Sequence, residues 1–168
     1  MSTPTEEKSA TPKTNVLVKK SITVNASAAR AFEVFTKDMT SWWPLATHHI
    51  SKVDAKEAVI EPFVNGRWFE RGVDGSECDW GTVLAWDPPS RVVLAWQLTA
   101  DWKYDASFLT EVEVRFTPEG AGTRVDLEHR LHERYGDRTE EIRKALDSDD
   151  GWTGMLRAYG NRASNSTA

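Results

Sequence analysis

The feature that most constrains the fold is a long run of alternating apolar and polar residues, followed by one helical stripe. Between residues 56 and 131 the apolar side chains recur at about every second position, which indicates strands rather than helices. The predicted strands are residues 56–61, 66–71, 77–86, 91–98, 109–117 and 122–131. Turn signals separate them, among them Asp87-Pro-Pro-Ser90, whose prolines remove two backbone donors. Consecutive strands joined by short turns predict an antiparallel meander.

The helical parts of the sequence lie on either side of this run. Residues 16–24 alternate as a further strand, and Ser27 is placed to cap a short helix over residues 28–36. A second helical turn over residues 38–43 ends at Pro44. Near the C-terminus, apolar residues recur with spacings of three and four, as on one face of a helix. They are Trp152, Met155, Leu156 and Tyr159.

The order of these elements predicts an α+β fold of the helix-grip kind. A curved antiparallel sheet of six to seven strands wraps around a long C-terminal helix, with one or two short helices after the first strand. A curved sheet that grips a helix tends to leave a cavity between them. We therefore expect residues 16–162 to form one domain with an internal cavity. The polar segments 1–15 and 163–168 are expected to be disordered tails.

Composition narrows the classes of function. The net charge is −5, whereas non-specific binding of nucleic acid needs a basic face. The chain has one cysteine, Cys78, so its fold does not depend on an intrachain disulfide. No apolar run approaches the roughly 20 residues of a membrane-spanning helix, and residues 1–15 lack the apolar segment of a signal peptide. We expect a cytoplasmic protein with no nucleic-acid partner and no membrane insertion.

The strand phase orients several side chains. In residues 122–131 the charged residues share one set of alternate positions, which must face water, so His129 lies on the opposite, apolar side. In residues 91–98 the same argument turns Trp96 inward. A neutral imidazole offers a donor and an acceptor in an apolar wall, which suits a ligand with one polar end. An inward histidine is also typical of an ordinary core residue, and both interpretations stay open.

Tryptophan is unusually frequent, with eight in the chain. Its flat, amphipathic ring serves either in a core or as the wall of a pocket. We predict a small hydrophobic or aromatic ligand in the cavity. The candidate binding residues are Trp43, His48, Arg67, Trp68, Glu70, Trp80, Trp96, His129, Trp152 and Leu156.

Charged residues are dense over two neighbouring predicted strands, around Arg67, Glu70 and Glu77. One interpretation is a set of cross-strand arginine–carboxylate pairs on a solvated face. The other places Arg67 or Glu70 at the mouth of the cavity, where it would anchor a polar head group. Neither metal nor cofactor is predicted, because His48, His49 and Cys78 lack the spacing of a ligand motif and no phosphate-binding loop is present.

Three segments carry a resemblance to a known family. They are residues 61–70 (EPFVNGRWFE), residues 81–96 (GTVLAWDPPSRVVLAW), and Gly151-Trp152 with Leu156. They resemble the activator of heat-shock protein 90 ATPase homology family, part of the START-like, Bet v 1-like superfamily. The resemblance covers about residues 16–162 and implies a helix-grip fold with a cavity between sheet and helix. Stand-alone members are small bacterial proteins, and the family supplies no fixed catalytic residues.

The resemblance also implies a chaperone partner, but through a part that differs here. The eukaryotic co-chaperone carries an additional N-terminal domain that binds the chaperone, where this chain has a polar segment of 15 residues. We therefore expect non-catalytic binding of a small hydrophobic ligand. A protein-interaction module, as a homodimer or a chaperone partner, is one alternative. An enzyme of the cyclase or hydrolase type is the other, with His129 and a carboxylate such as Glu70 as its acid–base pair.

Overall fold

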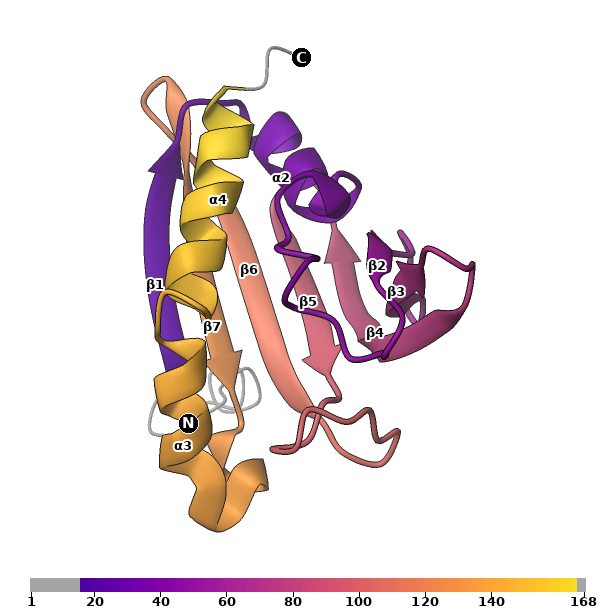
Figure 1. The fold of residues 1–168 in the computed structure, drawn as a ribbon. Helices are drawn as coiled ribbons and strands as arrows, with labels where there is room; N and C mark the ends of the chain where they lie inside the picture. Colours follow the sequence, from indigo (N-terminus) through magenta and orange to yellow (C-terminus); the bar gives the residue numbers. More distant parts are fainter. Residues whose placement is uncertain (1–15, 166–168) are drawn as a thin grey trace.

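The computed structural model describes residues 16–165 of the chain (Figure 1). In chain order the elements are β1 (Val16–Val24), α2 (Ala28–Thr36), η2 (Met39–Ser41), β2 (Ala55–Ile60), β3 (Arg67–Gly72), β4 (Glu77–Asp87), β5 (Arg91–Trp96), β6 (Thr110–Glu119), β7 (Gly122–Arg130), η3 (His132–Arg138), α3 (Thr139–Leu146) and α4 (Trp152–Ser164). The predicted helix-grip α+β fold is confirmed.

Seven antiparallel strands form one sheet in the order β1-β7-β6-β5-β4-β3-β2. Strands β2 to β7 follow one another as the predicted meander, and β1 joins them through β7. The sheet curves around α4, which runs alongside β1 (Figure 1). Register shifts in the β3–β4 and β4–β5 pairings accompany this curvature.

The C-terminal helix is divided, at the segment between Leu146 and Trp152. Gly151 and Gly154 let the turn fold back closely, because a Cβ on Gly154 would lie 1.8 Å from the Asp149 carbonyl oxygen. The helical region that the sheet grips therefore consists of α3 and α4. Helix α4 continues through Ser164, two residues past the expected end of the domain, and Ser164 accepts a hydrogen bond from the Asn25 amide. Residues 1–15 and 166–168 of the two expected tails lie outside the described residues.

The core lies between the inner face of the sheet and the helices. The predicted stripe on α4 is buried there, and Tyr159 donates a hydrogen bond to the Ala31 carbonyl of α2. Ser27 caps α2 as predicted, accepting a hydrogen bond from the Arg30 amide. Inner positions of the central strands are apolar and fully buried: Val83, Val92, Leu94, Val112, Val114, Val125 and Leu127.

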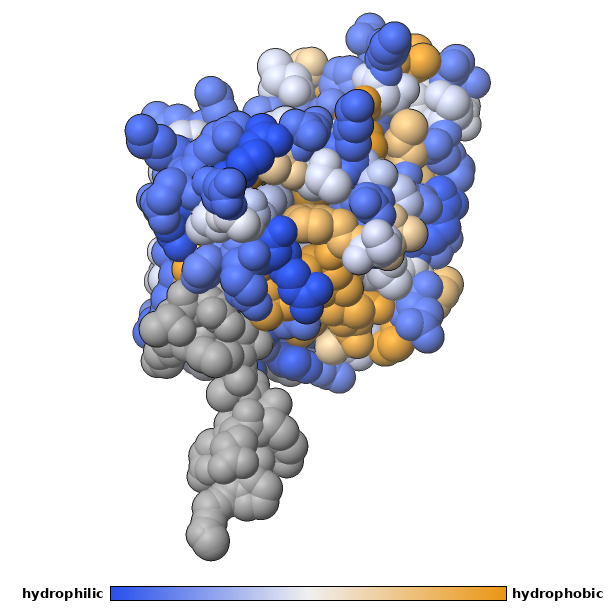
Figure 2. Space-filling view, turned by 90° about the horizontal axis from the view of Figure 1, so that it is seen from below, coloured by the Kyte–Doolittle hydropathy of each residue, from blue (hydrophilic) through white to orange (hydrophobic). Residues whose placement is uncertain are grey.

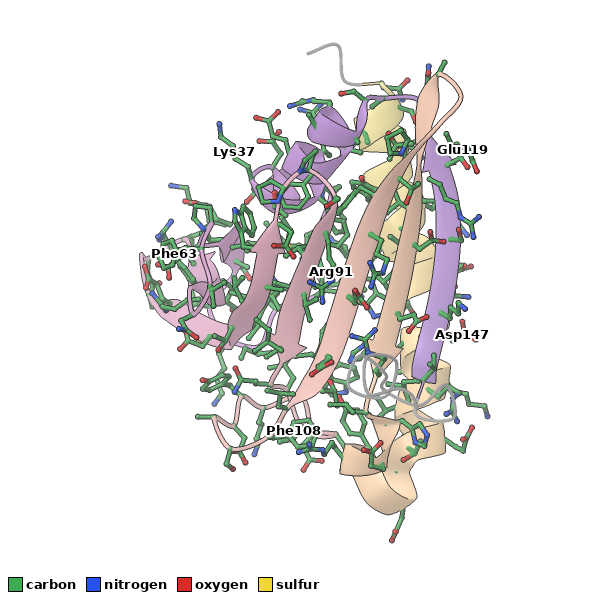
Figure 3. All side chains as sticks on the ribbon, turned by 180° about the vertical axis from the view of Figure 1, so that it is seen from behind. Lys37, Phe63, Arg91, Phe108, Glu119 and Asp147 are labelled. Atoms are coloured by element: carbon green, nitrogen blue, oxygen red, sulfur yellow. The ribbon has the colours of Figure 1, made fainter. Side chains whose placement is uncertain are left out.

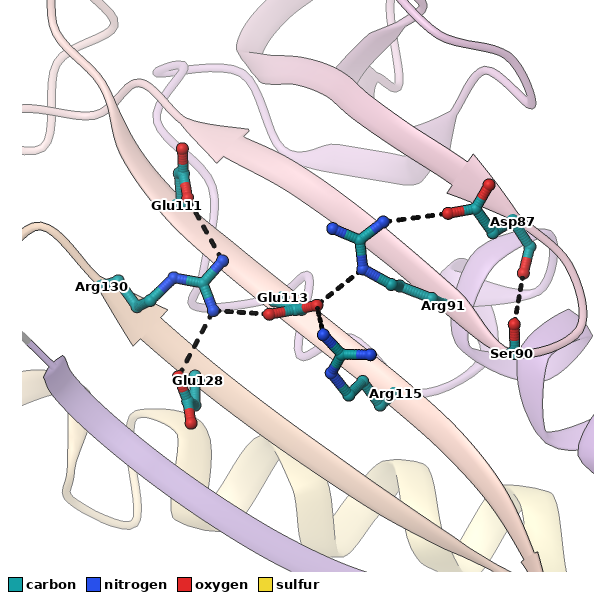
Figure 4. Close-up of polar contacts among 8 residues, drawn as sticks. All are labelled: Asp87, Ser90, Arg91, Glu111, Glu113, Arg115, Glu128 and Arg130. Atoms are coloured by element: carbon teal, nitrogen blue, oxygen red, sulfur yellow. Dashed lines mark hydrogen bonds and ion pairs between the residues drawn. The ribbon is translucent and has the colours of Figure 1, made fainter. Parts of the chain in front are cut away.

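The outer face of the sheet carries charged side chains (Figure 3). Its centre is Glu113 on β6, which accepts hydrogen bonds from Arg91 on β5 and Arg130 on β7 at 2.7 and 2.6 Å (Figure 4). Arg115 pairs with the same carboxylate at 2.7 Å. This network ties three adjacent strands, β5, β6 and β7, together on the side away from α4. Within residues 16–165, no helix is both long and apolar enough to cross a membrane.

Candidate functional site

A cavity of about 400 Å³ opens between three segments: the 44–53 loop, the β5–β6 loop over residues 97–109, and the α3–α4 turn. Figure 2 views the end of the molecule where the β5–β6 loop and α3 lie, and shows a hydrophobic area among hydrophilic residues. The lining residues are Trp43, Thr47, His48, His49, Ile50, Trp80, Trp96, Leu98, Trp102, Ala145, Leu146, Ser148, Asp150, Gly151 and Met155.

Four tryptophans line this cavity. Trp43 and Trp80 lie at 5.1 Å between ring centroids with an interplanar angle of 33°. Trp96 meets Trp102 edge to face at 6.5 Å. Flat indole faces and edges of this kind present a large, rigid apolar surface.

A second layer of residues lies behind this wall. Trp68 contacts Trp80 and Trp96 at 5.7 and 5.8 Å, and its indole N–H points to the Met39 sulfur at 3.4 Å. Trp152 lies 5.9 Å from Trp96. Three of the predicted binding residues are buried but do not line the cavity: Trp68, Trp152 and Leu156. They support the residues of the wall from behind.

His129 is buried on the inner face of β7, as the strand phase predicts. Trp152 donates its indole N–H to Nδ1 at 3.1 Å, so the ring proton is on Nε2 and is donated to Thr110 Oγ1 at 2.8 Å. Thr110 in turn donates to the Trp96 carbonyl at 3.3 Å. Burial, followed by the charge of Arg130, lowers the pKa of His129 to about 3. This histidine is therefore a neutral link between α4 and the cavity wall.

Glu70 is 1% exposed and faces inward from β3. One carboxylate oxygen accepts the Ile50 amide and the Trp80 indole N–H, each at 2.7 Å, and the other accepts the Ser51 amide at 3.1 Å. All three partners are donors, which suits an ionised carboxylate. Glu70 thus fixes both the 44–53 loop and a tryptophan of the wall.

The polar part of the lining is concentrated in the 44–53 loop and the α3–α4 turn. Thr47 Oγ1 and His48 Nδ1 lie 2.7 Å apart, and His48 Nε2 contacts the Asp150 carbonyl oxygen. Because a carbonyl only accepts, Nε2 carries a proton. This contact joins two of the three segments that surround the opening.

Arg67 does not line the cavity, which corrects the expectation that it anchors a head group there. Residues alternate along β3, so Arg67 lies on the face opposite to Trp68 and Glu70. It pairs with Glu77 and Asp79 at 2.9 and 2.8 Å. The interpretation as cross-strand pairs on a solvated face is confirmed for this arginine.

The acid–base pair proposed from the sequence does not form. Neither His129 nor Glu70 lines the cavity, and each is already engaged by other partners. With a pKa of about 3, His129 also lacks the proton that a general acid would donate near neutral pH.

The charge of the lining is also one-sided. No lysine or arginine is present among the cavity-lining residues of the described chain, whereas Asp150 is one of them. Glu70 lies directly behind Trp80. No group of three or more histidine, cysteine, aspartate or glutamate side chains within residues 16–165 is arranged to hold a metal ion.

Sequence reasoning missed part of the lining. Trp102 and Leu98 lie on the β5–β6 loop, Ile50 on the 44–53 loop, and Leu146 and Met155 on the helices. A bulky apolar residue in a polar loop was the available signal for Trp102. Met155 belongs to the predicted helical stripe, which indicates packing against the sheet and gives no sign that this residue also lines the cavity.

Fold and site together define a helix-grip protein of the START-like superfamily with an aromatic cavity. The sequence model of the family described as "Activator of Hsp90 ATPase homolog 1-like protein" matches residues 25–158, and the chain belongs to this family. The family assignment from the sequence is thereby confirmed.

Solved structures extend the comparison. An anthrahydroquino-γ-pyrone synthase, Txn09, complexed with SUM, is 40% identical, with a TM-score of 0.60 over 86% of this chain and 94% of that one. CalC, a self-sacrificing resistance protein from Micromonospora echinospora, is 29% identical, with a TM-score of 0.64 over 87% and 92%. An Aha1 dimer from Colwellia psychrerythraea, 15% identical with a TM-score of 0.56 over 90% and 98%, shares the fold. The search of curated proteins gave no match.

Proposed function

We propose that this protein binds a neutral, planar polycyclic aromatic molecule in the tryptophan-lined cavity. The observation that carries the proposal is a wall of four tryptophans in a cavity whose lining residues include no lysine or arginine. A volume of about 400 Å³ lies within the usual range for small-molecule sites. The similarity to a protein named as an anthrahydroquino-γ-pyrone synthase, at 40% identity, supports an aromatic ligand.

The lining favours neutral over anionic ligands. A carboxylate or sulfonate in the cavity would find no cationic partner among the lining residues and would face Asp150, with Glu70 behind the wall. Desolvating an anion without a partner is costly. Of the hydrophobic ligands expected from the sequence, fatty acids therefore fit less well than uncharged aromatic molecules.

Calorimetric titration with two matched probes tests the proposal. We expect 1,8-dihydroxyanthraquinone to bind, quench tryptophan fluorescence and raise the Tm. Anthraquinone-2-sulfonate should bind at least about tenfold more weakly, since burying its charge has no compensation. Absence of binding by the neutral probe, or equal affinity for the two probes, would contradict the proposal.

A variant that fills the cavity provides the structural control. Ala145 lines the cavity from the exposed side of α3, so Ala145→Phe should block the site without disturbing the core. Lys144→Phe places the same ring at the neighbouring position, which does not line the cavity. We expect binding of the neutral probe to be lost in the first variant and retained in the second.

The 40% identity to a protein named as a synthase favours a second candidate, ring closure on an aromatic ligand. In such a step a phenol oxygen attacks a side-chain ketone, the new C–O bond forms, and water leaves to give a γ-pyrone. Among the lining residues, His48 carries an imidazole whose Nδ1 lies beside Thr47 Oγ1. Because Nε2 faces the Asp150 carbonyl, Nδ1 is the atom that would take the phenol proton, with the phenol in the place of the Thr47 hydroxyl.

The enzyme candidate is tested with an ortho-hydroxyaryl 1,3-diketone as the open-chain probe. We expect γ-pyrone absorbance to appear faster with the protein than without it. His48→Gln should slow ring closure at least tenfold while the affinity for the neutral quinone stays within about threefold. No acceleration by the wild-type protein would remove this candidate and leave the binding proposal intact.

The homodimer and chaperone partner expected from the sequence stay predictions. The relative described as a dimer is 15% identical, which is a likeness of fold. A solution mass measurement tests the first, and a pull-down with heat-shock protein 90 tests the second.

A further inference from the structure

Trp102 adopts a backbone conformation that a tryptophan rarely takes. Its φ is 62°, in the left-handed region, where the bulk beyond Cβ is unfavourable and glycine or asparagine is preferred. The Trp102 amide donates to the Thr99 carbonyl at 2.9 Å and closes a tight turn. A tryptophan at this position therefore makes the turn less stable than asparagine would.

Contacts within the fold do not compensate for this strain. Trp102 is 42% exposed, the largest side chain among the strongly exposed hydrophobic residues of the described chain. Its indole ring meets that of Trp96 at a centroid distance of 6.5 Å. An exposed indole in a strained conformation lowers stability in two ways at once, and such outliers cluster at ligand-binding sites.

The loop around Trp102 is nevertheless fixed in place. Asp101 accepts a hydrogen bond from Arg138 at 2.7 Å, and the Leu98 carbonyl accepts one from Tyr135 at 3.2 Å. Leu98 also pairs with Tyr104 across the loop. These contacts hold the indole at the opening of the cavity, where it lines one side.

We infer that Trp102 is the stacking residue that covers the aromatic ligand at the cavity opening, and that its strain is retained for this role. The inference rests on the proposed function and deepens it, because it assigns the outermost aromatic contact. A planar ligand in the cavity would cover the exposed part of the indole and complete its burial.

The test compares Trp102→Asn with the wild-type protein in two measurements. Asparagine suits a positive φ, so the Tm of the ligand-free variant should equal or exceed that of the wild type. The Kd for 1,8-dihydroxyanthraquinone should rise about tenfold, the usual loss for one aromatic stacking contact. Tyr104→Asn is the matched control, since this exposed aromatic residue belongs to the same loop but does not line the cavity.

The outcomes separate the two proposals. If the wild-type protein binds the quinone and Trp102→Asn binds it equally well, the stacking role is wrong and the proposed function stands. If the ligand-free Trp102→Asn variant melts below the wild-type protein, the argument from strain is wrong. A wild-type protein that binds no quinone overturns the proposed function and the stacking role together.

Discussion

At the scale of single residues, His129 shows how a buried polar group acquires a purely structural role. Its two ring nitrogens are both engaged, one by the indole of Trp152 and one by the hydroxyl of Thr110. The interpretation as an ordinary core histidine and the interpretation as a ligand contact were both open in the sequence. The hydrogen bonds decide for the first, because they leave the ring no free donor or acceptor.

The lowered pKa of His129 makes a prediction about acid stability. In the unfolded chain a histidine titrates near 6.5, whereas in the folded protein the pKa is about 3. Between these values the unfolded state binds one more proton, so the free energy of unfolding should fall as the pH drops, by up to roughly 1.4 kcal/mol per pH unit. Urea unfolding at pH 7, 6, 5 and 4 measures this slope.

A variant isolates this contribution. His129→Asn should be less stable at pH 7, because the Trp152 and Thr110 hydrogen bonds are disturbed, and its acid slope should be shallower by about one proton. An unchanged slope would mean that other groups carry the acid sensitivity.

At the scale of elements, Glu70 determines where the 44–53 loop lies. The 44–53 loop belongs to no helix or strand. Two of its backbone amides donate instead to one carboxylate, that of Glu70 on β3. The same carboxylate orients Trp80 in the wall. The position of the loop and the orientation of the wall therefore depend on one side chain.

Glu70→Gln should loosen this loop. The –NH2 group of glutamine would face one of the N–H groups from which Glu70 accepts. At least one buried N–H would then lack an acceptor, which should lower the free energy of unfolding by about 2–3 kcal/mol. Hydrogen exchange of the Ile50 and Ser51 amides should accelerate. Glu77→Gln, on the outer face, breaks exposed pairs and should cost less than about 1 kcal/mol.

Strands and helices could be predicted from the regular spacing of their apolar residues, whereas the residues that surround the cavity opening could not. The inward direction of Trp96 and His129 follows from alternation along a strand, which needs no knowledge of distant contacts. For Glu70 the sequence left a solvated face and the cavity mouth open, and it could not show that Ile50, 20 residues away, would meet this carboxylate. Trp102 lies in a loop that Arg138 holds through Asp101, 37 residues before it in the chain. Such long-range contacts leave no periodic pattern in the sequence.

At the scale of the whole molecule, the charged network on the outer face joins the middle of the sheet. Glu113 is nearly buried beneath three arginines from β5, β6 and β7. Burial raises its pKa, but the hydrogen bonds from Arg91 and Arg130 outweigh this effect, and the pKa is lowered overall. A carboxyl group whose pKa is lowered in the folded protein stabilises the fold at pH values above its ordinary pKa. This stabilisation is lost as the pH falls through the lowered pKa.

Glu113→Gln should therefore destabilise the entire sheet. Loss of the central charge leaves the buried Arg130 with only Glu111 and Glu128, and we expect a decrease of about 2–3 kcal/mol in the free energy of unfolding. Asp126→Asn, which breaks a more exposed pair with Arg124 on β7, should lower it by less than about 1 kcal/mol. Similar losses in the two variants, measured by urea unfolding, would contradict a central role for the network.

The pairing of β1 with β7 has a consequence for the time course of synthesis. Ser21 on β1 meets Asp126 on β7, 105 residues later, while the other strands each pair with their neighbour in the chain. During translation β1 is made first and pairs last, so its apolar residues Leu17, Val18 and Val24 stay uncovered on the ribosome until β7 has emerged. The nascent chain thus carries an unpaired, aggregation-prone strand for most of its synthesis.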